Sequence, residues 1–371
     1  MKYLKKKTCP KTTSSKDELL EILNAAQCED ASIENLQWLP SLRYVYCPNW
    51  LLQNIVNECC HPESISIFSI DTTYNVGNYY VTPTTYQRRN IIHKETGSIA
   101  HFPGPAMFHL QRTEREFHYF ASTLCEINNQ FATIRFIGGD RDQAQRKFLL
   151  PLSYPRPVYC TKHVKDDISM KLTSLGLNDY RSKYLSDIFG SVETKTQGLV
   201  DALTAKDFEE RLNQVCSGWN KDFLSYFNTY IKEDMKQGMT RSLLNHLGIE
   251  TFYNNASECT NKKIKVLGNE HNLEKKANRQ TKSLRLSHAE GISVYRKLVQ
   301  QHQRDLELSI LNRGSYQLTG PLAKLHLSDN KYNSMNPAER KRHFVKIDCF
   351  HKSPDLIHVE PAKIYHSEDD L

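Results

Sequence analysis

The sequence predicts an α/β protein in which helices flank a mixed five-stranded sheet. The first observation behind this prediction is the order of elements after residue 62, where short β-rich runs give way to alternating helical and β-rich segments. The second is a change of pattern at residue 166, after which helical periodicity with glycine punctuation continues up to residue 250. Together they indicate a sheet-containing core interrupted by an all-helical insertion.

Residues 63–165 hold the predicted sheet. Three strands, a helix, a strand, a helix and a strand are expected in the segments 64–77, 79–87, 106–112, 114–128, 131–140, 141–152 and 156–163. Three antiparallel strands followed by alternating helices and parallel strands are typical of a ribonuclease H-like sheet, in which the first and fourth strands lie side by side.

The remaining segments complete the predicted organisation. Residues 1–62 are a basic arm and helical lead-in, with Ser15 as an N-cap and a second helix that stops at Pro62. Residues 166–250 are the helical insertion, residues 251–345 are a helical completion of the core, and residues 346–371 are a C-terminal tail.

Composition excludes several classes of protein. No apolar run reaches the roughly 18 residues of a membrane-spanning helix, and the N-terminus lacks the apolar stretch of a signal peptide, which favours an intracellular protein without a membrane partner. The 10 cysteines include no CxxC pair and indicate reduced thiols instead of a disulfide framework. The net charge of +7 permits a polyanionic partner without requiring one.

Two aspartates stand at the ends of the strands that are predicted to be neighbours. Asp71 ends the first strand and Asp140 ends the fourth, so two carboxylates far apart in sequence are expected to meet. Glu258 follows the insertion. A helix beginning there, capped by Ser257 or Asn255, places Glu258 and Asn261 on one face and brings a third carboxylate to the same edge of the sheet.

Three converging carboxylates indicate a metal site. They repel one another unless cations compensate, and hard oxygen ligands suit Mg²⁺ or Mn²⁺. Two such ions stabilise the attacking and leaving oxygens of displacement at phosphorus, which predicts phosphodiester cleavage or strand transfer with Asp71, Asp140 and Glu258 as the catalytic and metal-binding residues. Asp142 is an alternative to Asp140, although its position favours a role in the first turn of a helix.

Four motifs in this order resemble those of the Mutator-like element transposase domain, which is of the DDE type. They are "FSIDTTYNVGNYYVTPTTY" with Asp71, "FPGPAMFHLQRTEREFHYFASTL", "IRFIGGDRDQA" with Asp140, and "NNASECTNKKIK" with Glu258. "YCTKHV" carries Cys160 and His163 in that family's Cys-x-x-His signature. The chain departs from the family at Cys259, where a serine is common, and at Gly139, where a threonine is common.

The resemblance implies a DNA transposase that acts in the nucleus. Its partners would be double-stranded DNA, namely terminal inverted repeats and target DNA, and a second copy of the chain in a homodimer that joins two DNA ends. The first candidate catalytic aspartate stands about 70 residues from the N-terminus, which leaves little room for the zinc-finger domain that such transposases usually carry, and no zinc-finger spacing precedes it. Two interpretations stay open: a fragment, or an element remnant that recognises its ends poorly.

Further residues are candidates for DNA contact. Cys160 and His163 are half of a zinc site with no second pair, and are assigned to the active-site wall or to DNA, with simple core packing as the alternative. Trp219 is a candidate for base stacking or for the core of the insertion. Segment 260–285 is strongly basic and is either a phosphate-tracking surface or a solvated linker; its candidates are Asn261, Lys262, Lys263 and Lys265.

Two other functions compete with an active transposase. One is a transposase-derived DNA-binding or regulatory protein that keeps the fold and no longer cuts DNA. The other is a ribonuclease H-like 3′ exonuclease, which requires an Asp-x-Glu pair on the first strand. Thr72 and Thr73 follow Asp71, and this disfavours the exonuclease.

Overall fold

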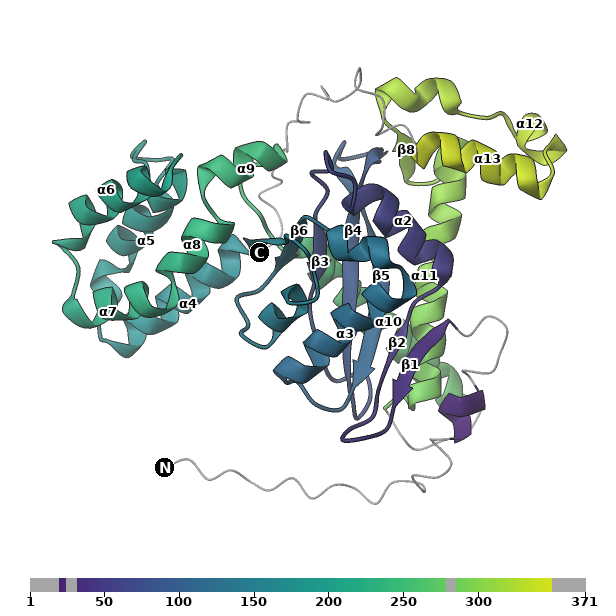
Figure 1. The fold of residues 1–371 in the computed structure, drawn as a ribbon, viewed down its shortest axis with the longest axis horizontal. Coiled ribbons are helices and arrows are strands. Elements are labelled where there is room, and N and C mark those ends of the chain that lie inside the picture. The colour runs from purple at the N-terminus through teal and green to yellow at the C-terminus, as the bar shows by residue number, and fades with distance from the viewer. Residues whose placement is uncertain (1–19, 25–31, 278–284, 349–371) are drawn as a thin grey trace.

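An eight-stranded mixed sheet is the centre of the computed structural model, which describes residues 20–24, 32–277 and 285–348 (Figure 1). The strands are β1 (Ile33–Gln37), β2 (Arg43–Tyr46), β3 (Phe68–Ile70), β4 (Tyr80–His93), β5 (Ile99–His109), β6 (Phe136–Gly139), β7 (Arg156–Tyr159) and β8 (Tyr316–Leu318). Their order is β1-β2-β5-β4-β3-β6-β7, and β8 pairs with β4. The α/β class and the mixed sheet are therefore confirmed.

Helices flank the sheet and fill the second half of the chain. They are α2 (Asn49–Cys59), α3 (Glu114–Ile127), α4 (Thr161–Ser174), α5 (Arg181–Phe189), α6 (Ala205–Cys216), α7 (Lys221–Tyr230), α8 (Lys232–Gly238), α9 (Arg241–Leu247), α10 (Asn255–Ala277), α11 (His288–Ile310), α12 (Asp329–Ser334) and α13 (Pro337–Asp348). None of the helices in the described part of the chain could cross a membrane. The described cysteines are all free thiols, as predicted.

The two faces of β3 contact different partners, since successive side chains of a strand point to opposite sides. Phe68 packs against Phe131 and Phe148, which belong to the segments around α3 and β6. The next residue, Ser69, is in register with Thr85 of β4, whose hydroxyl contacts Ser257 of α10 at 3.2 Å. The helix that carries Glu258 is therefore fixed to the face opposite Phe68.

The prediction that the first and fourth strands of the core are neighbours is confirmed. They are β3 and β6, which pair in parallel with Phe68 opposite Ile137 and Ser69 opposite Gly138. β6 also pairs in parallel with β7, whereas β4 and β5 pair antiparallel. The carboxyl ends of β3, β6 and β7 therefore lie along one edge of the sheet.

The helical insertion is confirmed as a lobe with its own core. Helices α4 to α9 separate β7 from α10, and Figure 1 shows them to one side of the sheet. The buried side chains of α4 to α8 form a cluster separate from the main core, in which aromatic rings such as Tyr184, Trp219 and Phe223 pack together. The buried leucines of α9 pack instead with Phe136 of β6 and Val158 of β7. The lobe begins at Thr161, five residues before the predicted boundary.

Several predicted elements are wrong in extent or type. The sheet has eight strands instead of five, because the lead-in contains the β1–β2 hairpin and the helical C-terminal part contains β8. β4 continues past the predicted end at residue 87 to His93, and β5 begins at Ile99 instead of at residue 106, since Pro103 and Pro105 interrupt the sequence pattern without ending that strand. Segment 131–140 forms a strand only from Phe136, and segment 141–152 forms a 3₁₀ turn, Gln145–Leu149, instead of a helix.

Part of the prediction falls outside the described residues. Most of the basic arm, the Ser15 cap and residues 349–371 of the tail belong to this part. Within the lead-in, α2 is confirmed and ends just before Pro62.

Gly138 is expected to be essential for the packing of β6. A Cβ at this position would lie 2.5 Å from both the Ser69 hydroxyl oxygen and the Phe252 ring, which belongs to the segment leading into α10. Gly138→Ala should therefore lower the free energy of unfolding by about 1–3 kcal/mol, measured by urea denaturation. The matched control is Gly320→Ala, whose new Cβ meets nothing within 4 Å and should change it by less than about 0.5 kcal/mol. Equal stabilities of the two variants would contradict this packing argument.

Candidate functional site

Asp71 and Asp140 occupy equivalent places on neighbouring strands. Asp71 is the first residue after β3, and Asp140 is the first residue after β6. Because β3 and β6 are parallel and adjacent, both carboxylates leave the sheet at the same edge. The predicted meeting of these two acids is confirmed in this respect.

Two hydrogen bonds hold the Asp71 carboxylate. The Thr72 amide donates to Oδ1 at 2.7 Å, and the Asn261 side-chain amide donates to Oδ2 at 2.7 Å. Burial, followed by the nearby Asp140 carboxylate and to a smaller extent Glu258, raises the pKa of Asp71 to about 6 against the opposing effects of the Thr72 amide and His163. Asp71 thus lies within electrostatic reach of both predicted partners, and Asn261 positions it.

His163 lies between the other two carboxylates. β7 ends at Tyr159, and His163 is in the first turn of α4 instead of in a strand as predicted. Its Nδ1 is 2.7 Å from Asp140 Oδ1, and its Nε2 is 3.8 Å from Glu258 Oε1. The hydrogen bond to Asp140, and next the one to Cys160, raise the pKa of His163 to about 11, so that this side chain is a cation at neutral pH.

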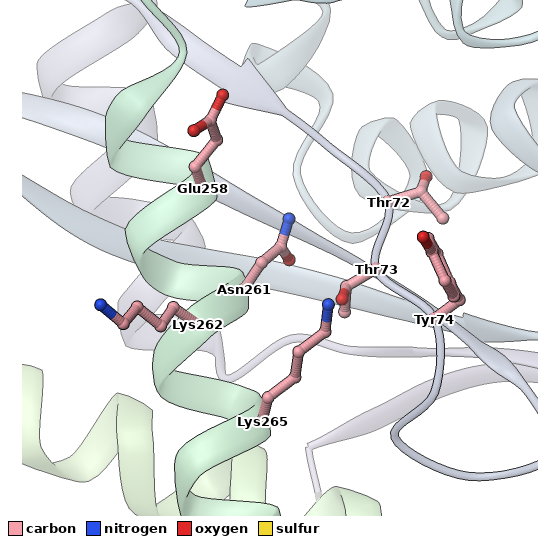
Figure 2. Close-up of a pocket in the computed structure, with 7 residues that line it drawn as sticks. All are labelled: Thr72, Thr73, Tyr74, Glu258, Asn261, Lys262 and Lys265. Atoms are coloured by element: carbon pink, nitrogen blue, oxygen red, sulfur yellow. The ribbon is translucent and has the colours of Figure 1, made fainter. Parts of the chain in front are cut away.

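Glu258 reaches the site from the first turn of α10. The helix begins at Asn255, and the Ser257 hydroxyl is bonded to Thr85 instead of capping the helix. The Asn254 amide, just before the helix, donates to Cys160 Sγ at 3.4 Å. Lys162 Nζ is 3.7 Å from Glu258 Oε2. Glu258 and Asn261 share one face of the helix, as predicted, and Figure 2 shows both at the same pocket.

Cys160 contacts both His163 in the first turn of α4 and Asn254 just before α10. Burial alone would raise the pKa of its thiol, but hydrogen bonds with His163 and Asn254 outweigh burial and lower it. The ligand atoms of Asp140, Cys160 and His163 lie within 4.8 Å of one another. This group holds three candidate ligands, one fewer than a structural zinc site needs.

Asp142 has a different role from Asp140. Its Oδ1 accepts hydrogen bonds from the amides of Ala144 and Gln145 at 2.7 and 3.2 Å, and its Oδ2 pairs with Arg112 at 2.5 Å. Asp142 therefore caps the start of the 3₁₀ turn, and the alternative in which it replaces Asp140 is not favoured.

Arg141 ties the Asp140 segment to the helical insertion and was not identified from the sequence. Its guanidinium pairs with the buried Asp234 of α8 at 2.8 Å and with Asp167 of α4 at 3.0 Å, and it also donates to the Tyr230 carbonyl. Its position directly after Asp140 was the one available signal. The insertion thus helps to fix the end of β6.

A pocket of about 340 Å³ adjoins the carboxylates. The loop after Asp71 and the first turns of α10 form its walls, and its lining residues are Thr72, Thr73, Tyr74, Glu258, Asn261, Lys262 and Lys265 (Figure 2). The sequence analysis identified the α10 residues but not Tyr74, whose exposure depends on the loop conformation.

Two of the predicted DNA-contacting residues lie elsewhere. Trp219 is 6% exposed, donates to Asp187 at 2.8 Å and packs in the core of the insertion, so base stacking does not fit this residue. Lys263 does not line the pocket and is instead close enough to Asp305 of α11 to oppose the burial that raises the pKa of that carboxyl.

Comparison of the chain with protein-family models, curated proteins and solved structures finds no match in any of the three.

Asp71→Asn should stabilise the protein at high pH. The folded-state pKa of about 6 exceeds the ordinary value of 3.8, so the wild-type carboxylate costs no stability below pH 4, an increasing amount between pH 4 and 6, and the full amount above pH 6. We expect the variant to gain about 1–3 kcal/mol in free energy of unfolding at pH 8 and nothing at pH 4, measured by urea denaturation without divalent cations. A variant that is no more stable than wild type at pH 8 would show that the site does not destabilise this charge.

Proposed function

We propose that this chain is the catalytic core of a DDE-type DNA transposase of the Mutator-like kind, which cleaves and joins DNA phosphodiester bonds. One observation carries the proposal: Asp71 and Asp140 leave adjacent parallel strands at one edge, and Glu258 is brought to the same place by the helix that follows the insertion. Metal-dependent phosphoryl transfer needs such a cluster of oxygen ligands.

The topology supports a ribonuclease H-like fold for this core. In the order β5-β4-β3-β6-β7 the first strand of the core, β3, is central, antiparallel to β4 and parallel to β6. This is the arrangement expected of three antiparallel strands followed by parallel ones. Strands β1, β2 and β8 are additions to it, and helices α4 to α9 correspond to the all-helical insertion before the third acidic residue.

The donor set fits divalent cations. Burial is the largest cause of the raised pKa of Asp71, and the Asp140 and Glu258 carboxylates add to it, as expected of an acidic cluster with too little compensating positive charge. Asp71, Asp140 and Glu258 would hold two Mg²⁺ or Mn²⁺ ions, which when bound activate the attacking water and stabilise charge on the phosphoryl oxygens.

The chain's own side chains prepare this site. Asn261 orients Asp71 through its 2.7 Å hydrogen bond. The His163 cation lies between Asp140 and Glu258 and partly offsets their repulsion. Lys262 and Lys265 line the adjoining pocket and supply positive charge for a phosphate backbone. The substrates in this proposal are terminal inverted repeats and target DNA in the nucleus, joined by a homodimer.

Loss of any one of the three carboxylates should abolish DNA cleavage. We expect Asp71→Asn, Asp140→Asn and Glu258→Gln each to lower the nicking rate by at least about 100-fold, because even the outer-shell partners of metal ligands contribute 10–100-fold. The assay follows nicking and strand transfer with Mg²⁺ or Mn²⁺ on duplex DNA that ends in the inverted repeats flanking the coding sequence. Asp142→Asn is the matched control, since its carboxylate caps a turn, and it should retain most of the activity.

The outcomes separate the competing functions. Variants of all three carboxylates that nick at the wild-type rate would contradict the proposed catalytic roles. A wild-type protein that binds this DNA and leaves it uncut with either metal would favour the catalytically silent DNA-binding alternative.

A further inference from the structure

The pocket beside the carboxylates has an aromatic wall and a cationic wall. Tyr74 lies on the loop that begins at Asp71, and Lys265 lies nearly three turns into α10. Figure 2 shows the Asn261 and Lys265 side chains pointing from α10 toward this loop. Because Asn261 bonds to Asp71, the two walls are joined at the carboxylate itself.

The two residues just before Tyr74 are held by hydrogen bonds to β4. The backbone of Thr73 exchanges two hydrogen bonds with Val81, at 2.8 and 3.1 Å. The Thr72 hydroxyl contacts Thr82 at 2.9 Å, and Thr82 contacts His109 Nε2 at 2.8 Å. His109 Nδ1 is 2.5 Å from the Gln111 carbonyl oxygen and must donate to it. In the neutral ring Nε2 therefore accepts from the Thr82 hydroxyl, and the Thr82 oxygen in turn accepts from the Thr72 hydroxyl. Tyr74 therefore stands on a rigid segment.

The Tyr74 ring is available to a ligand. This side chain is 59% exposed, in contrast to the buried Trp219. Lys265 Nζ is 5.3 Å from the ring centroid, which places a cation against the ring and orients it. An exposed, oriented aromatic ring is a stacking surface for an unpaired base, and a neighbouring lysine suits the phosphate of the same nucleotide.

We propose that this pocket binds a single unpaired nucleotide next to the phosphodiester that is cut, with its base stacked on Tyr74 and its phosphate paired with Lys265. The proposal rests on the proposed function, since the pocket opens beside Glu258 and the Asp71–Asn261 pair. The volume of about 340 Å³ is at the size of small-ligand sites and suits one nucleotide better than a duplex. The chain would thus hold the DNA end locally unpaired during reaction.

The test measures binding to the full chain with EDTA present, so that no DNA is cut. The probe is a duplex with one unpaired 2-aminopurine nucleotide at its end, and the reference duplex has an abasic nucleotide at that position. We expect wild type to bind the probe about 5-fold to 100-fold more tightly than the reference, and to quench its fluorescence by stacking. Tyr74→Ala should remove this preference without weakening binding to the abasic duplex, and Tyr74→Phe should keep it.

Lys265→Gln should weaken binding to both duplexes and reduce the salt slope of the affinity by about 1, because one phosphate contact is lost. The matched controls are Tyr154→Ala and Lys206→Gln, which remove an 89% exposed tyrosine and a lysine on α6, both outside the pocket. Neither control should change the base preference or the salt slope.

Failure of this inference and failure of the proposed function are distinguishable. A wild-type protein that nicks DNA but shows no base preference, or a preference that survives Tyr74→Ala, overturns the nucleotide subsite alone. A base preference that depends on Tyr74 in a protein that does not nick DNA supports the subsite and overturns the catalytic assignment.

Discussion

The parallel pairing of β3 with β6 is the constraint on which the rest of the site depends. It brings Asp71 and Asp140 to one edge of the sheet although 68 residues separate them (140 − 71 − 1). Gly138 permits the close approach of the two strands and of Phe252, which leads into the helix carrying Glu258. The close packing around Gly138 therefore links the position of β3 and β6 to the position of the helix that carries Glu258.

The sheet edge that holds the three carboxylates also holds one cation, His163. Burial and two neighbouring carboxylates disfavour the charge on Asp71, whereas His163, held by Asp140, contributes a cation between the other two acids. Folding alone does not favour such a cluster, since an apolar edge would avoid the repulsion. A cluster of oxygen ligands that lowers the stability of the fold is the physical pattern expected where binding of cations supplies the compensation.

The sequence was informative where local pattern and chain order decide the structure. The element order predicted the adjacency of the two strands, and helical spacing placed Glu258 and Asn261 on one face. The prediction from sequence failed where contacts between residues far apart in the chain determine the local structure. Pro103 and Pro105 break the strand pattern of β5 without ending the strand, and the helical start that carries His163 follows β7 without a strong signal. The exposure of Tyr74 depends on a loop that contacts distant strands.

The central claim is that three acidic residues from β3, β6 and α10 form one metal site. The most direct measurement is a crystal structure of the protein with Mn²⁺, using anomalous diffraction to locate the ions. The account predicts anomalous density bounded by Asp71, Asp140 and Glu258, with carboxylate oxygens at metal-ligand distance. Manganese bound at other residues, with these three carboxyl groups more than roughly 10 Å apart, would contradict it.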